Sequence, residues 1–472
     1  TNIRLTVAGD LSDRFSYNFK MSSSNFEQSH SNGGGELFDC PTLNGVGHRA
    51  IPVDPQPAGR QTTLFFPQPQ PAVDCTFNGA RGVNDVPPGV AASNNLLAQF
   101  GDGSLGEEYE SENYTLTLDY ALDNIDLQTI INYHDAELGW VSDFDGGGVT
   151  SIFAGEFNTL EQFAVEARAI TKFDSPVNFV LGVYYQETER YFNQDVIFAF
   201  IRNTGPIDDP NDEFTAYNKE SETDGETWSV YGEVTWEISD RLELTAGARY
   251  IEETKDSWFI QPYVNPWFQG LFIPYISTDV LTRAAADQKW DDLIPEVTLT
   301  YALTDNITIY GAYKEGFKSG GFSNSAILSN LSPNGFNDFI FEPEEVKGGE
   351  VGAKAAVLDS SMLLTFEVFF YDFEDLQVDY FNSAQFAYVT ENAGGSETKG
   401  AELQVEWLTP IEGLYLSGSI SYLSSTFTEF ESFCSTGQTL AQGCVLPPPP
   451  ASETAARQSL DGNDRPGAPE WS

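Results

Sequence analysis

The sequence predicts an all-β protein, a large antiparallel up-and-down β-barrel that crosses a membrane, and three observations indicate this fold class. First, apolar and polar residues alternate along runs of about ten residues, whereas strands of soluble sheets average roughly five or six. Second, tight turns and long loops follow these runs in strict alternation, which sorts them to opposite ends of a barrel. Third, none of the 472 residues belongs to an apolar run as long as a membrane helix needs, roughly 18 to 20 residues.

The alternating runs pair into hairpins from the first residues onward. Residues 3–9 and 15–20 are the first expected pair, joined by a turn at 10–13. The later pairs are expected at 114–122 with 125–134, 163–167 with 179–185, 228–238 with 242–250, 297–303 with 307–317, 351–357 with 364–370, and 403–407 with 414–420. These runs amount to about fourteen or fifteen strands, all assigned to one barrel domain over residues 1–472.

Long external loops are expected between the hairpins, because Gly, Pro, Asn and Asp gather there without any sustained period. The predicted loops cover residues 22–108, 139–157, 193–223, 256–289, 319–343, 375–394 and 427–461. A loop as long as the first is uncommon in a compact domain unless it has a function.

The strand that begins at Ile307 shows the two faces most clearly. Ile307, Ile309 and Tyr313 point to one side of this strand, and Thr308 and Lys314 point to the other. Charged residues recur on the polar faces of other runs, at Glu166, Arg168, Glu233, Glu237, Glu243, Arg249, Glu402 and Glu406. Because burying such charges in a packed core is costly, the sequence predicts a water-filled interior.

The composition is strongly acidic, with 71 Asp and Glu against 23 Lys and Arg and a net charge of −48. This charge argues against nucleic acid as a partner, since binding there depends on basic side chains that neutralise phosphates. It is compatible with solubility of long exposed loops, with divalent cations or cationic partners, and with a saline habitat.

Four cysteines lie outside the strand-like runs, and an even number in loops favours an oxidising compartment. Proximity in the sequence favours disulfides between Cys40 and Cys75 and between Cys434 and Cys444, out of three possible connectivities. The three histidines have no metal-ligand spacing and no Gly-x-Ser-x-Gly motif is present. No enzymatic activity and no cofactor are therefore expected.

Aromatic residues in the predicted loops are candidates for a ligand-capture surface, because loops carry function disproportionately. They also have the alternative role of folding the loops onto one another. These residues are Trp140, Phe144, Trp258, Tyr263, Trp267, Phe268 and Tyr275.

The segment that follows Ile309 resembles the "S-Y-x-x-G-F-K-S-G-G-F" barrel strand of TonB-dependent outer-membrane receptors. The residues that carry this resemblance are Tyr313, Gly316, Phe317, Lys318, Ser319, Gly320, Gly321 and Phe322. Four further segments resemble motifs of the same family in the same order: 231–236 with 242–250, 341–346 with 350–354, 392–402, and 462–471. These motifs are structural, and their glycines permit close strand packing.

The resemblance implies a receptor in the outer membrane of a Gram-negative bacterium, surrounded by lipid. By this resemblance the loops capture a scarce small-molecule or oligosaccharide ligand, with a ferric siderophore as the first expectation. An inner-membrane TonB complex then moves a plug domain that blocks the barrel. Barrels of this family have 22 strands, and no plug precedes Thr1, so both ends of the receptor are expected to lie outside this sequence.

Two other functions fit a large barrel. A passive porin would have the same strand pattern, and steady ion conductance would distinguish it from a plugged receptor. A barrel that serves as an adhesin or an enzyme is the other alternative.

Overall fold

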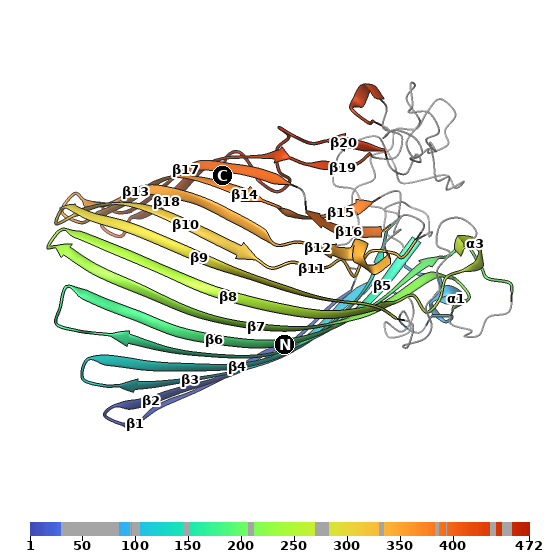
Figure 1. The fold of residues 1–472 in the computed structure, drawn as a ribbon, viewed down its shortest axis with the longest axis horizontal. Coiled ribbons are helices and arrows are strands. Elements are labelled where there is room, and N and C mark those ends of the chain that lie inside the picture. The colour runs from blue at the N-terminus through green and yellow to red at the C-terminus, as the bar shows by residue number, and fades with distance from the viewer. Residues whose placement is uncertain are drawn as a thin grey trace.

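The computed structural model describes residues 1–29, 85–94, 96, 104–144, 152–205, 212–269, 283–329, 335–382, 387–392, 394–434, 440–445 and 456–472. Its main element is a 14-stranded antiparallel sheet whose strands lie side by side in chain order (Figure 1). The strands are β1 (Asn2–Ser12), β2 (Phe15–Ser29), β3 (Gly106–Ala121), β4 (Ile125–Asp143), β5 (Ile152–Thr171), β6 (Val177–Phe198), β7 (Thr215–Ser239), β8 (Leu242–Ile260), β9 (Ala284–Thr304), β10 (Ile307–Lys318), β13 (Glu344–Val357), β14 (Met362–Glu374), β17 (Gly395–Leu408) and β18 (Tyr415–Glu429). The predicted all-β, antiparallel fold class is confirmed.

Smaller elements lie in the long connections. They are the strand pairs β11 (Gly321–Phe322) with β12 (Ile340–Phe341), β15 (Gln377–Asn382) with β16 (Ala387–Asn392), and β19 (Glu431–Phe433) with β20 (Arg457–Ser459), and the short helices α1 (Pro88–Ala91), α3 (Pro266–Gln269), η3 (Gly335–Phe339) and η4 (Leu440–Gln442). No helix in the described part of the chain is long and apolar enough to cross a membrane. In Figure 1 the tight turns lie together at the left end of the sheet and the long connections at the right end, as the alternation of loop lengths predicts.

Several strands extend further toward the long loops than the sequence predicts. β7 has 25 residues and β6 has 22, although about 9 to 11 residues suffice to cross a bilayer. Consequently the predicted loops 22–108, 139–157, 193–223 and 256–289 are too wide, because ordered strands occupy their ends. The apolar alternation stops where lipid contact stops, but backbone pairing continues beyond it. Around the other two connections, β10 ends at Lys318 and β13 begins at Glu344, and β14 ends at Glu374 and β17 begins at Gly395.

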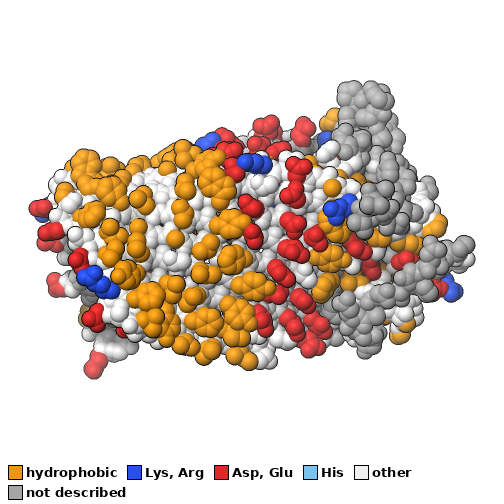
Figure 2. Space-filling view, turned by 60° about the horizontal axis from the view of Figure 1, so that its bottom comes forward, with side chains coloured by type: hydrophobic (Ala, Val, Ile, Leu, Met, Phe, Trp, Pro, Cys, Tyr) orange, Lys and Arg blue, Asp and Glu red, His pale blue; other side chains and the backbone are white. Residues whose placement is uncertain are grey.

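The two faces of the sheet have different chemistry. The outer face exposes apolar side chains at alternate positions, for example Leu181, Val183 and Val230. Figure 2 shows hydrophobic side chains as a broad band toward the tight-turn end, bordered on the loop side by Asp and Glu. The inner face carries the predicted charges in bonded arrangements: the Tyr231 hydroxyl donates to Glu166, and the Arg168 guanidinium donates to Gln128.

An unbroken row of carboxylates crosses the outer face where the apolar band ends. Strand register places one acidic residue directly opposite the next on seven consecutive strands, β3 to β9. This acidic row consists of Glu112, Asp135, Glu161, Glu189, Asp224, Asp256 and Asp287. Like charges directly opposite one another repel, so the row is compatible with water and not with lipid.

The last residues of the chain lie beside β18. Backbone amides of Ser421 and Leu423 donate to the carbonyl oxygens of Ser472 (3.0 Å) and Glu470 (2.9 Å). The Tyr422 and Trp471 rings also pack together, 4.9 Å between centroids. The segment 463–472 thus runs antiparallel along β18 and pairs with it through isolated bridges.

One of the two expected disulfides lies in the described part of the chain. Cys434 and Cys444 are bonded, with their Cα atoms 5.7 Å apart. Cys40 and Cys75 lie outside the described residues.

Candidate functional site

The motif residues 318–322 leave β10 and contact the inner face of β8. Lys255 Nζ donates to Ser319 Oγ (2.9 Å) and to the Gly320 carbonyl oxygen (2.8 Å). The same ammonium forms an ion pair with Glu253 (2.8 Å), and Ser319 Oγ also donates to Glu253 Oε1 (2.8 Å). These bonds fix the point at which the loop turns inward.

The two glycines of the motif are required by close packing. A Cβ on Gly320 would lie 2.4 Å from the Phe341 carbonyl oxygen and 2.5 Å from the Trp290 ring. A Cβ on Gly321 would lie 2.7 Å from the Phe341 ring. Trp290 is itself held by its indole N–H, which donates to Glu342 Oε2 (3.2 Å). Only glycine therefore fits between β9 and β12.

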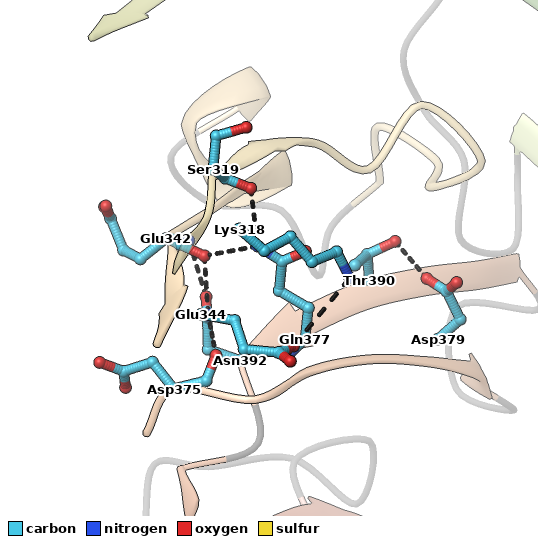
Figure 3. A network of polar contacts seen from close by, with 9 residues as sticks. All are labelled: Lys318, Ser319, Glu342, Glu344, Asp375, Gln377, Asp379, Thr390 and Asn392. Carbon is cyan, nitrogen blue, oxygen red and sulfur yellow. Dashed lines mark hydrogen bonds and ion pairs between the residues drawn. The ribbon is translucent and has the colours of Figure 1, made fainter. Parts of the chain in front are cut away.

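A polar clasp joins this loop to the β15–β16 hairpin, and Figure 3 shows its residues. Gln377 Nε2 donates to the carbonyl oxygens of Ser319 (2.9 Å) and Glu342 (3.1 Å), and its backbone N–H donates to Glu344 Oε2 (2.8 Å). Asn392 accepts from the Glu342 N–H (2.7 Å) and donates back to the Glu342 carbonyl oxygen (2.9 Å). The clasp, defined as Ser319, Glu342, Glu344, Gln377 and Asn392, makes one unit of two loops.

The residues after the motif, 323–329, form a strap against the inner face of β7 and the end of β8. Asn324 Nδ2 donates to Thr223 Oγ1 (3.3 Å). The Gln261 side chain accepts from the Leu328 N–H (2.7 Å) and donates to the Leu328 carbonyl oxygen (3.2 Å), as a neighbouring strand would. Nearer the long-loop end of β7, Lys219 Nζ donates to the Ser325 carbonyl oxygen (2.6 Å).

Aromatic rings anchor the other side of this loop. Phe259 at the end of β8 packs against Phe339 (5.2 Å between centroids) and Phe336 (6.0 Å), and Phe322 stacks on Phe336 (5.5 Å). Val389 of β16 joins the same buried cluster. Apolar burial of this kind is the main source of stability for a loop segment.

Four of the predicted loop aromatics come together at the long-loop end. Trp140 packs on Phe144 (5.8 Å between centroids), and Trp267 packs on Phe268 (4.8 Å). Phe198, which the sequence analysis did not single out, joins the two pairs and also contacts Phe200 (5.7 Å). The mouth aromatic cluster is therefore Trp140, Phe144, Phe198, Phe200, Trp267 and Phe268. The run of apolar residues at 196–201 was the available sequence signal for the two that were missed.

The other predicted loop aromatics lie elsewhere. Trp258 is on β8 with its N–H on Glu222 (3.3 Å) and the Arg283 guanidinium over its ring, on the outer face. The Tyr263 hydroxyl accepts a hydrogen bond from Asn203 (2.9 Å). Tyr275 lies outside the described residues.

The cluster combines buried and exposed rings. Phe144, Phe200 and Trp267 expose 41%, 49% and 50% of their surface, whereas Phe198 and Phe268 are buried beneath them. Exposed rings held by buried ones make a preorganised apolar surface. The described residues contain no group of three or more His, Cys, Asp and Glu arranged to hold a metal ion.

Comparison with known proteins identifies the same architecture. A family model described as "TonB dependent receptor-like, beta-barrel" matches residues 59–472. The pesticin receptor of Yersinia pestis is 24% identical over 246 residues, which is 51% of this chain and 31% of the relative. The pesticin receptor of Yersinia enterocolitica matches to the same extent. The chain thus spans about a third of the length of these curated relatives.

Solved structures of similar fold include a siderophore receptor and a ferric yersiniabactin uptake receptor. The siderophore receptor PiuA from Acinetobacter baumannii has a TM-score of 0.62 at 16% identity, over 100% of this chain and 60% of that chain. The ferric yersiniabactin uptake receptor FyuA from Yersinia pestis has a TM-score of 0.58 at 17% identity, over 90% of this chain and 51% of that chain. At these identities the likeness concerns the fold.

Proposed function

This chain belongs to the TonB-dependent receptor β-barrel family, and from that premise we propose that it is the barrel of a receptor that captures and imports a ferric siderophore. Its location is the outer membrane of a Gram-negative bacterium. The energy for import comes, in this proposal, from a TonB complex that acts on a plug inside the barrel.

The mouth aromatic cluster is the observation that carries the capture step. Its three exposed rings lie at the long-loop end of the sheet, on a buried support that keeps them in place. Such rings offer flat apolar surfaces to a chelate with aromatic or apolar groups. The siderophore titles of the similar structures support this choice of ligand class.

The proposal is tested by binding of ferric siderophores to the purified full-length receptor, measured by quenching of intrinsic fluorescence. At least one ferric complex is expected to bind, with its iron-free form binding more weakly. Trp267→Ala and Phe200→Ala are each expected to weaken this binding about fivefold, because each removes stacking worth about 1 kcal/mol.

Trp258→Ala is the matched control for these variants. It removes an indole of the same size from the outer face of β8, away from the cluster, and is expected to leave the affinity unchanged. Failure of every ferric complex to bind, together with steady open-channel conductance in a planar bilayer, would show a porin instead.

A further inference from the structure

The strap is held to the inner wall by a lysine in an unusual environment. Lys219 is 1% exposed and lies between the rings of Phe192 and Tyr217, each centroid 5.8 Å from Nζ. Its hydrogen-bond acceptor is the Ser325 carbonyl oxygen on the strap. Within the described residues, no carboxylate forms an ion pair with it.

This environment favours the uncharged amine over the ammonium. An ammonium has three N–H donors, and one carbonyl and two ring faces replace its water poorly. Burial therefore lowers the pKa of Lys219 to about 7. Lys219 is outside the membrane-crossing part of β7, whose exposed apolar residues begin at Val230, about 36 Å farther along the strand.

Few charged groups counteract the lowering of the Lys219 pKa by burial. Glu156 of β5 favours the charged form, but Gln194 and Asn158 already donate to its carboxylate (2.8 and 2.7 Å). Tyr217 stays neutral, since burial raises its pKa. Glu220 and Asp195 occupy neighbouring strand positions whose side chains point to the opposite face. The strap itself, residues 323–329, contains no charged residue.

The Lys219 side of the strap has apolar as well as polar contacts, because Ile327, which is 0% exposed, packs in one cluster with Tyr217 and Phe268. Among the residues that the structure describes, Ser221 Oγ and Asn324 Oδ1 are buried and have no hydrogen-bond partner. The opposite side is anchored by the rings of Phe259, Phe336 and Phe339. Unsatisfied polar groups lower the stability of the contact they belong to, so protonation of Lys219 adds to a cost that this side of the strap already carries.

We propose that the strap is a proton-operated gate on the inner wall, which opens when Lys219 takes up a proton and closes when it loses one. This gate is a property of the barrel and does not depend on which cargo the receptor carries. Because the closed strap covers the inner face of β7 and β8, opening it widens the passage below the mouth aromatic cluster.

The direction of the pH effect follows from linkage. In the open state Lys219 meets water and has its ordinary pKa of about 10.4, whereas the closed state has the lower value. The closed state therefore binds fewer protons, and rising pH stabilises it. Between about pH 10 and pH 7, each unit of acidification increases the open-to-closed ratio about tenfold, and below pH 7 the ratio is constant. If Lys219 held the strap through an ion pair instead, the strap would open with rising pH, because the lysine would lose its charge.

Thiol labelling of the strap tests the gate. Ile327 is 0% exposed on the Tyr217 side of the strap, so Ile327→Cys reacts with a maleimide only when that side of the strap opens. The labelling rate of this strap cysteine is divided by the labelling rate of Glu412→Cys, whose position is exposed on a tight turn. The division removes the pH dependence of the thiol itself. The chain without either probe gives the background from native cysteines.

The normalised rate is expected to fall about 30-fold or more from pH 7 to pH 9 in the purified chain. Lys219→Met keeps the length of the side chain without a charge, and its normalised rate is expected to be low and independent of pH. Lys318→Met, which removes a lysine that is 63% exposed, is expected to keep the pH dependence.

Two results would overturn the gate. One is a normalised labelling rate that stays constant or rises between pH 7 and pH 9 in the protein that keeps Lys219. The other is the same pH dependence with Met at position 219. Neither readout needs a ligand, so the gate fails or stands separately from the proposed siderophore uptake.

Discussion

At the scale of single residues, Gly320 determines whether the motif loop can turn inward. Any side chain there meets a backbone oxygen and the Trp290 ring. Gly320→Ala is expected to reduce the free energy of unfolding by about 1 to 3 kcal/mol, as overpacking does elsewhere. The change is measured by urea unfolding and by proteolysis between β10 and β13.

Gly418→Ala is the control for this variant. Gly418 lies on β18 with nothing within 4 Å of its would-be Cβ, so the added methyl group meets open space. Equal effects of the two substitutions would contradict the packing argument.

A second residue-scale prediction concerns Asp195, at the loop end of β6 and outside the membrane-crossing part. Its carboxylate is buried and accepts a hydrogen bond from Asn94 Nδ2 (2.9 Å), in the segment that follows α1. Burial raises the pKa of Asp195 to about 6. The protonated form is thus favoured in the folded state, so its stabilising effect is full below about pH 4 and lost as the pH rises to 6.

Asp195→Asn keeps an acceptor for Asn94 and removes the charge. It is expected to stabilise the chain by up to about 3 kcal/mol at pH 7 and to flatten the pH dependence between 4 and 6. Unfolding free energies at pH 4, 5, 6 and 7 check this. A variant that is less stable than the parent at pH 7 would show that the carboxylate is needed in its charged form.

At the scale of elements, the clasp predicts that two loops open together. Gln377→Ala removes the donor to Ser319 and Glu342, and Asn392→Ala removes both bonds to the Glu342 backbone. Each is expected to cost about 0.5 to 1.5 kcal/mol, the net contribution of a typical hydrogen bond, because these bonds are partly or fully open to water. Their combined cost is expected to differ from the sum by about 0.5 kcal/mol or more.

The measurement is a double-mutant cycle with hydrogen exchange on β11–β12 and β15–β16. Either single variant is expected to increase exchange in both strand pairs. Exchange that increases only in the pair carrying the substitution would show two independent loops.

At the scale of the whole molecule, the acidic row marks the outer edge of the bilayer. Val183 and Glu189 share the outer face of β6, but Val183 lies in the apolar band and Glu189 in the acidic row. Val183→Arg is expected to cost about 2 to 4 kcal/mol in lipid vesicles. Glu189→Arg is expected to be neutral or stabilising, because it separates Glu161 from Asp224. The free energies of unfolding of the two variants are measured by urea unfolding in lipid vesicles. Equal losses of stability in the two variants would place the acidic row inside the lipid.

The sequence by itself determined the spanning architecture of this protein. Lipid on one side and water on the other require an apolar residue at every second position, so the strands and their faces could be predicted from Ile309, Tyr313 and their equivalents. The same pattern located the tight turns, and the motif that ends in Phe322 identified the family. Both signals are local, and no distant contact is needed to read them.

Only the tertiary structure decided how the loops are used. The ends of β4 to β9 extend past the apolar alternation, because backbone pairing holds strands together after lipid contact has ended. The acidic row depends on register across seven strands. The Lys219 and Ser325 pair joins residues 106 positions apart. A sequence shows which side chain stands at each position, but the burial that changes its chemistry comes from segments that fold onto it from elsewhere in the chain.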